Sequence, residues 1–241
     1  MSFRSIARFL YNNLPVRIRC LIMSIRAREK VTIGRGSFIH PTVHLLGRNS
    51  ICVGDNVCIS ADCWLNVNHR IANAVGIGIG NNCFIGKHNF FTSGKGIYLG
   101  DYTLTTIGCR FIGSSHIFDD PEVPYLLTGT TNTNVIKVGV NCFFGAGSTV
   151  LGNVSVGHGS VIGADAMVTQ DIPPFSLVVG NPAKVVKRYS FSRKTWLPVI
   201  EITGQDEKDM PDEARYLASL VKSYPRISMP WIAAGKSMGD L

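Results

Sequence analysis

One histidine could carry a proton in a reaction: His116, in the segment GSSHIFDD at 113–120. The pKa of an imidazole lies near neutrality, so the ring can accept a proton from a hydroxyl group and pass it on to a leaving group. Asp119 and Asp120 follow closely and could orient the ring, although acidic loop residues are more often simply solvated. On position alone, a loop histidine that bonds a backbone carbonyl is the more common case, so the surrounding pattern must decide.

The elements that position His116 follow a period of six residues. An apolar residue recurs at every sixth position, and glycine follows four of these six: Val138, Phe144, Val150, Val156, Ile162 and Val168. Weaker copies of the period run from Ile33 to Thr105. Such a period is typical of stacked β-coils, with one inward apolar side chain per unit and glycine or a short polar residue at each bend. The sequence therefore predicts an all-β solenoid.

A second set of positions supports the same fold. Four residues into many units the side chain is small, as a crowded inner corner requires: Ser37, Val43, Val57, Cys63, Cys83, Thr103, Cys109, Cys142, Ser148, Val154, Ser160 and Ala166. Four of the seven cysteines occupy these positions, where a free thiol behaves as a compact apolar group. We therefore expect reduced thiols and a cytoplasmic protein without a disulfide framework.

The chain divides into three parts. Residues 1–30 place apolar side chains at helical intervals among six arginines, which predicts basic amphipathic helices that either cap the first coil or contact a membrane surface or an acceptor. Residues 31–188 carry the repeat, with a protruding loop at 114–137 where the period stops. Residues 189–241 form an extension with a helix near 211–224, where an apolar face follows an acidic first turn.

Composition narrows the partners. The net charge is +8, from 24 basic and 16 acidic residues, which suits nucleic acid, a membrane surface or a phosphate-rich cofactor. No aromatic-basic platform or recognition-helix motif accompanies the charge, so we expect no nucleic acid partner. Arginines interrupt the apolar residues of the N-terminal stretch, so it holds no run long enough for a signal peptide core or a membrane span.

The segment VIGADAMVTQDIPPFSLVVGNPAKVVKR at 161–188 resembles the last coils of hexapeptide-repeat acyltransferases, which read IGAGSVVTKDIPP followed by GNPAKVIK. The resemblance extends over most of the repeat and indicates the branch that O-acetylates sugars and polysaccharides. It implies a left-handed parallel β-helix, assembled as a homotrimer with active sites in the clefts between subunits. The handedness comes from the resemblance, because the usual rule for parallel crossovers favours the right hand.

The resemblance also implies a role for His116. In these O-acetyltransferases the general base is a histidine sixteen residues after the glycine of an IGD unit, and here Gly100 precedes His116 by that interval. A sugar hydroxyl activated by the histidine would attack the acetyl thioester directly, and a backbone N–H of an adjoining coil would hold the oxyanion. The family's asparagine that positions acceptor and base has its nearest counterpart in Asn89, with His88 as a rival.

Further site residues are implied by the same resemblance. Asp119 and Asp120, which the resemblance does not cover, could contact the sugar. Here IFDDPEVP replaces the family's proline-rich stretch that ends in a basic residue, so the resemblance leaves the acceptor's identity open. Acetyl-CoA is the implied co-substrate. Ala146 and Ala164 would contact its pantetheine arm, Thr169 would flank the adenine, and Lys184 and Lys187 would meet the phosphates. Gln170 stands where the family often has lysine. The alternative explanation for the alanines is packing of the repeat, and that for the lysines is a solvated basic turn.

A metal is not expected. The repeat also occurs in γ-class carbonic anhydrases, where two of the zinc-binding histidines lie five residues apart, but residue 121 is proline and leaves His116 without that partner. His40, His44, His69 and His158 are interpreted as structural or surface residues.

The leading hypothesis is an acetyl-CoA-dependent O-acetyltransferase acting on a sugar hydroxyl of a capsule, O-antigen or sialic acid polymer. The added N-terminal segment and the C-terminal extension offer surface for a large acceptor, and the basic N-terminal helix could make a peripheral contact with the inner face of the membrane. N-acetylation of an amino sugar nucleotide, acetylation of an antibiotic or serine, and a non-catalytic hexapeptide scaffold remain alternatives.

Overall fold

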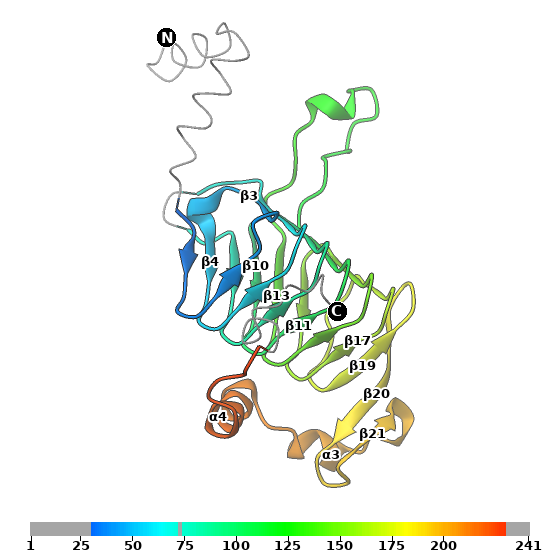
Figure 1. The fold of residues 1–241 in the computed structure, drawn as a ribbon. Coiled ribbons are helices and arrows are strands. Elements are labelled where there is room, and N and C mark those ends of the chain that lie inside the picture. The colour runs from blue at the N-terminus through cyan, green and yellow to red at the C-terminus, as the bar shows by residue number, and fades with distance from the viewer. Residues whose placement is uncertain (1–29, 72–73, 230–241) are drawn as a thin grey trace, which may run out of the picture.

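The computed structural model describes residues 30–71 and 74–229, and these form a three-sided prism of stacked coils with a helical C-terminal extension (Figure 1). Except for Lys30, the predicted amphipathic helices at 1–30 lie outside the described residues. Each coil contributes one short strand to each of three sheets, and the strands within a sheet pair in parallel register from coil to coil. The predicted solenoid is confirmed.

The three sheets are named here A, B and C. Sheet A contains β1 (Thr32–Ile33), β4 (Ile51–Val53), β7 (Ile77–Ile79), β10 (Gly96–Leu99), β13 (Val135–Val138) and β16 (Val154–Val156). Sheet B begins with β2 (Phe38–Ile39), β5 (Cys58–Ile59), β8 (Phe84–Ile85), β11 (Leu104–Thr105), β14 (Phe143–Phe144), β17 (Val161–Ile162) and β19 (Ser176–Val179). Sheet C contains β3 (His44–Leu46), β6 (Trp64–Val67), β9 (Phe90–Ser93), β12 (Arg110–Ile112), β15 (Thr149–Leu151) and β18 (Met167–Val168).

The six-residue period places one ladder of apolar side chains on the inner side of each sheet. All six residues of the regular repeat are buried: Val138, Phe144, Val150, Val156, Ile162 and Val168. On sheet C the ladder includes Phe91 and Phe111, whose rings stack 4.7 Å apart, and Phe111 meets Phe144 of sheet B edge-on at 5.1 Å. These contacts tie neighbouring coils and neighbouring sheets into a single core.

The small residues lie at the inner corners, as predicted. Apart from Ser37 in the first coil, every one of them is buried. Several of the hydroxyls and thiols bond the carbonyl of a neighbouring coil; the Cys83 Sγ, for example, lies 3.3 Å from the Gly100 oxygen. The corners are thus held by small polar groups that satisfy backbone carbonyls inside the prism.

The prism ends where the chain turns back on itself. Strand β20 (Lys184–Ser190) pairs antiparallel with β19, and β21 (Thr195–Pro198) pairs antiparallel with β20, so the last residues of the predicted repeat region already belong to a hairpin. The described residues also include the short 3-10 helices η1 (Arg48–Ser50), η2 (Tyr125–Leu127) and η3 (Val199–Glu201). Helices α3 (Gly204–Asp209) and α4 (Glu213–Ser223) follow, the second within the range where the sequence predicts a helix.

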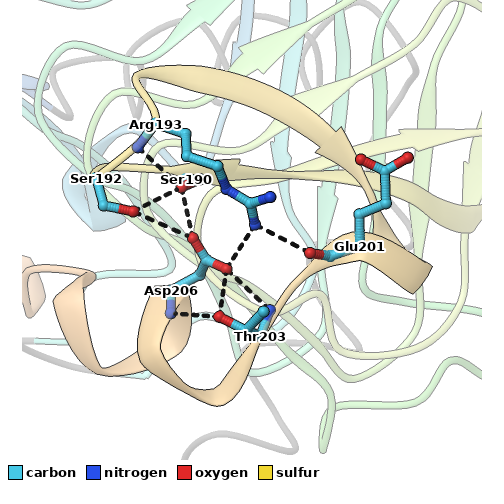
Figure 2. A network of polar contacts seen from close by, with 6 residues as sticks. All are labelled: Ser190, Ser192, Arg193, Glu201, Thr203 and Asp206. Atoms are coloured by element: carbon cyan, nitrogen blue, oxygen red, sulfur yellow. Dashed lines mark hydrogen bonds and ion pairs between the residues drawn. The ribbon is translucent and has the colours of Figure 1, made fainter.

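A buried carboxylate fastens the hairpin to α3 (Figure 2). Asp206 accepts hydrogen bonds from the hydroxyls of Ser190 and Thr203, and from the Arg193 guanidinium at 2.7 Å. The Thr203 side chain in turn accepts from the Asp206 amide, which completes a capping box at the start of α3. The hydrogen bond from Ser190, followed by those from Thr203, holds the pKa of Asp206 well below its usual range.

After α4 the chain returns along the corner between sheets A and B. The Tyr102 hydroxyl donates to the Tyr224 oxygen at 2.8 Å, and the Asn56 amide donates to the Ile227 oxygen at 2.8 Å. The segment therefore crosses several coils. Within the described ranges, no helix has the length and apolar character needed to cross a membrane.

Candidate functional site

His116 lies on an arm that leaves the prism between β12 and β13 (Figure 1). The base of the arm is a short antiparallel ladder in which His116 pairs with Thr130. The Thr131 amide donates to the Ser115 oxygen at 2.8 Å, and the Ser114 hydroxyl donates to the Thr131 oxygen at 3.1 Å. This ladder fixes the backbone at His116, while the remainder of the arm projects away from the coils.

The His116 side chain itself is exposed, and its ring nitrogens make no hydrogen bond to any described residue. Neither nearby carboxylate orients it. The Asp120 side chain accepts from the Glu122 amide at 2.9 Å, and Asp119 is exposed. The imidazole therefore keeps a free nitrogen that a hydroxyl group could approach.

One side chain of the prism holds the arm. Nε2 of His69, in the segment after β6, lies 3.0 Å from the Thr130 hydroxyl, opposite His116 in the ladder. The sequence predicts only a structural or surface role for His69. Its contact with the arm joins residues 61 positions apart, and no local pattern could have indicated it.

Asn89 is placed elsewhere. It occupies the inner corner between sheets B and C, is 1% exposed, and donates from Nδ2 to the backbone oxygens of Gly86, Lys87 and Thr106. Its Oδ1 is buried without a hydrogen-bond partner. His88 is exposed, and its Nδ1 lies 3.9 Å from Asp62. In this chain Asn89 supports a corner, and no hydrogen bond connects it to the arm.

The proposed donor residues lie along an outer corner of the prism. Ala146 and Ala164 are both exposed at the corner between sheets B and C, in successive coils, and the Asp165 amide donates to the Ala146 oxygen at 2.8 Å. The preceding position has no room for a side chain, since a Cβ on Gly145 would lie 2.5 Å from the Ala164 nitrogen. Small residues thus make a shallow ledge on which a narrow, extended ligand could lie against the backbone.

The other residues expected to bind the donor lie on the last coil and on the hairpin that follows it. Thr169 is exposed directly after β18, and Gln170 beside it is exposed too. Lys184 and Lys187 are exposed on β20, opposite Val179 and Leu177 of β19. Both ammonium groups are therefore open to an anion, as a phosphate contact requires.

Thiol and metal chemistry find no support in the described part of the chain. Burial raises the pKa of the Cys83 thiol to about 12 and that of Cys63 to about 11, so both stay neutral near pH 7. No group of three or more potential metal-binding side chains occurs among the described residues. His158 is buried and structural, with Nε2 3.0 Å from the Pro211 oxygen.

Comparison with known proteins agrees with the repeat. Residues 135–170 match the family model described as hexapeptide repeat of succinyl-transferase. A putative acetyltransferase from Staphylococcus aureus is 37% identical over 110 residues, which cover 46% of this chain and 54% of the relative. A probable acetyltransferase from Mycobacterium tuberculosis is 30% identical over 172 residues, covering 70% of this chain and 53% of the relative. The chain thus spans about half the length of these curated relatives.

Solved structures share the architecture. The N-acyltransferase AntD from Bacillus cereus, in complex with dTDP and 3-hydroxybutyryl-CoA, superimposes with a TM-score of 0.61 at 17% sequence identity, covering 85% of this chain and 96% of AntD. A second AntD structure, a mutant with dTDP-4-amino-4,6-dideoxyglucose and coenzyme A, gives a TM-score of 0.59 at 18% identity, covering 78% and 96%. The fold is the left-handed β-helix, and the resemblance to hexapeptide-repeat acyltransferases is confirmed.

Proposed function

We propose that this hexapeptide-repeat chain is an acetyl-CoA-dependent O-acetyltransferase that acetylates a sugar hydroxyl, with His116 as the general base. The observation that carries the proposal is the arm at 113–134, which interrupts an otherwise regular prism. Its backbone is paired at His116, while the imidazole bonds none of the described residues. The relatives named acetyltransferases support the class of reaction. A scaffold that only bound a partner would need no such residue.

The reaction proceeds by direct transfer. The free nitrogen of His116 accepts the proton of the sugar hydroxyl as its oxygen attacks the thioester carbonyl; the C–S bond then breaks, and the thiolate recovers the proton from the imidazolium. A backbone N–H of an adjoining coil holds the oxyanion. Direct transfer needs no acyl-cysteine intermediate, and burial raises the pKa of the Cys83 and Cys142 thiols so that both stay neutral near pH 7.

The donor lies along the ledge of Ala146 and Ala164. The small, exposed side chains of Ala146 and Ala164 let a pantetheine arm approach the backbone, and exposed Lys184 and Lys187 supply positive charge for the phosphates. Thr169 flanks the adenine. We further propose that the enzyme is a cytoplasmic homotrimer. Its acceptor is a capsule, O-antigen or sialic acid polymer. Its basic N-terminal segment contacts the inner face of the membrane.

The test compares two histidine variants with labelled acetyl-CoA and a panel of sugars, sugar nucleotides and short polysaccharides. We expect His116→Ala to lower the rate of transfer by about 10²–10⁴-fold, the usual contribution of a general base. His40→Ala, in which the replaced histidine bonds only Thr42 in the first coil, serves as the control and should keep full activity.

Circular dichroism and acetyl-CoA binding of the His116 variant must match the parent chain, so that the loss reports chemistry. Undiminished turnover would refute the mechanism. Hydroxylamine releases acetyl from an ester and not from an amide, so a product that resists it would favour N-acetylation of an amino sugar. A lack of transfer to every acceptor would favour the scaffold.

A further inference from the structure

The outer face of β6 and β9 carries aromatic and amide side chains that the proposed mechanism does not use. Trp64 and Asn66 on β6, and Phe90 and Thr92 on β9, point outward, while the residues between them fill the core. Trp64 is 45% exposed, and its ring meets Phe90 edge-on at 5.5 Å. This pair holds a large indole in place at the surface.

The polar members of this face are linked in a chain. Nδ2 of Asn66 donates to Oδ1 of Asn68, and Nδ2 of Asn68 donates to the Thr92 hydroxyl at 3.0 Å. The Asn66 oxygen accepts no hydrogen bond from the described residues, and the Thr92 hydroxyl still has its own proton to donate. Asn66 is half-buried and therefore retains hydrogen-bonding capacity at the surface, whereas Thr92 is 7% exposed and supports Asn68 from below.

The face is also uncharged. The nearest cationic side chain on the following strand is Arg110, which pairs with Phe90 in the sheet. Its guanidinium is engaged by the Thr149 hydroxyl at 2.9 Å and the Gly147 oxygen at 3.0 Å, on the side of the later coils. Both of these partners are neutral, so Arg110 keeps its charge beside Phe90, and exposed His44 of β3 pairs with Trp64 on the other side. The outward side chains of β6 and β9 themselves carry no charge, and they offer a ring with hydroxyl groups an aromatic surface and amides.

The position of the face relates it to the arm. Asn68 is followed directly by His69, which contacts Thr130 opposite His116. Along β6, Trp64 and Asn66 are separated by two strand residues, about 6.6 Å, which is the scale of one hexose ring. A sugar ring on the indole would thus extend through the amides toward the edge of sheet C where the arm begins.

We infer that the outer face of β6 and β9, from Trp64 to Asn68, is the acceptor subsite and takes a neutral saccharide. The apolar face of one sugar ring packs on Trp64, and its hydroxyls bond Asn66. His69 joins this subsite to the arm that carries His116. The inference rests on the proposed function, because it names the acceptor class for the same site.

The experiment measures saccharide binding and acetyl transfer separately on the full chain. Binding to an array of neutral mono- to tetrasaccharides is compared for the parent, Trp64→Ala, Trp64→Phe, Asn66→Ala and the control Phe38→Ala. Phe38 has a similar exposure, 43%, but lies on the outer face of sheet B.

We expect Trp64→Ala to weaken binding and raise the KM for the acceptor about tenfold, the loss of one well-placed aromatic contact, with the KM for acetyl-CoA unchanged. Trp64→Phe should restore most of the binding, Asn66→Ala should weaken it severalfold, and Phe38→Ala should change nothing.

The subsite is refuted if the parent binds no neutral saccharide, or if Trp64→Ala and Phe38→Ala behave alike. Trp64-dependent binding without any acetyl transfer would instead refute the proposed function and leave the subsite standing. Acetyl transfer with an acceptor KM that Trp64→Ala does not change would refute the subsite and leave the proposed function standing.

Discussion

Two adjacent phenylalanines on β14 test the register of the whole prism. Phe144 is fully buried in the core against Phe111, whereas Phe143 is 36% exposed on the outer face of the same strand. Truncating a buried phenylalanine removes its transfer free energy and leaves a cavity, which together cost about 3–5 kcal/mol. Phe144→Ala also removes the edge-on contact with Phe111, worth about 0.5–1.5 kcal/mol of that total.

Phe143→Ala should cost far less. Its side chain lies between Leu104 and Val161 of the neighbouring coils, and water fills the space that truncation opens. We expect a loss of about 1 kcal/mol, so the two variants should differ by about 3 kcal/mol in free energy of unfolding. A shift of one residue in register would reverse the order, because alternate side chains face opposite sides of a strand.

The measurement is urea unfolding of both variants at one protein concentration, because an oligomer's apparent stability depends on concentration. Hydrogen exchange adds a local readout: in a solenoid each coil contacts only its neighbours, so Phe144→Ala should release the amides of the coils on either side before those of the first coil. Equal losses for the two variants, or a larger loss for Phe143→Ala, would refute the inward assignment of Phe144.

Three further predictions concern ionisable groups. Because the pKa of Asp206 is held below its usual value of 3.8, its charge stabilises the fold above about pH 4, and that contribution is lost as the pH falls. Asp206→Asn should therefore lower the melting temperature at pH 7 and make the melting temperature fall less steeply in acid. The control Asp209→Asn, at an exposed residue, should have neither effect. Burial raises the pKa of Cys83 and Cys142 to about 12, so a thiol reagent should label them in the native protein far more slowly than half-buried Cys52. Peptide mass mapping measures the rates, and equal rates would contradict the burial of Cys83 and Cys142. Since these folded-state pKa values exceed 9.0, their contribution to stability is complete below pH 9 and should fall at higher pH.

The core could be predicted from the sequence because its cause is local. A side chain six residues after Val138 meets the same inner space in the next strand, so spacing alone identifies Phe144 and Val150 as core residues. The small corner residues follow from the same geometry. Composition and period thus determine which side chains face inward, whatever the distant parts of the chain do.

The surface could not be predicted in the same way, because its contacts join distant residues. Asn56 bonds Ile227, 171 positions away, and no pattern near Pro225 indicates that the segment returns along the prism. Asn89 lies inside a corner with its amide on backbone oxygens, and the acceptor contact that motif comparison implies for it stays a prediction. The alternation of Trp64 and Asn66 with apolar residues indicates which side chains of β6 face outward. It does not show that Trp64 packs against Phe90 of the next coil.

The geometry of sheet C bears on the homotrimer that we propose. The arm with His116 leaves from one edge of this sheet, between β12 and β13, and the ledge of Ala146 and Ala164 lies at the opposite edge, before β15 and β18. Each strand between the two edges has two to four residues, so the separation is about 10 Å at roughly 3.3 Å per residue. A general base must come within about 3 Å of the proton that it accepts, and the edge where the arm begins is farther than that from the ledge of the same chain. If sheet C of one subunit faces the ledge of the next, the acceptor on β6 and β9 and the donor meet beside His116. The exposed, unpaired imidazole therefore supports a site completed by a second copy of the chain.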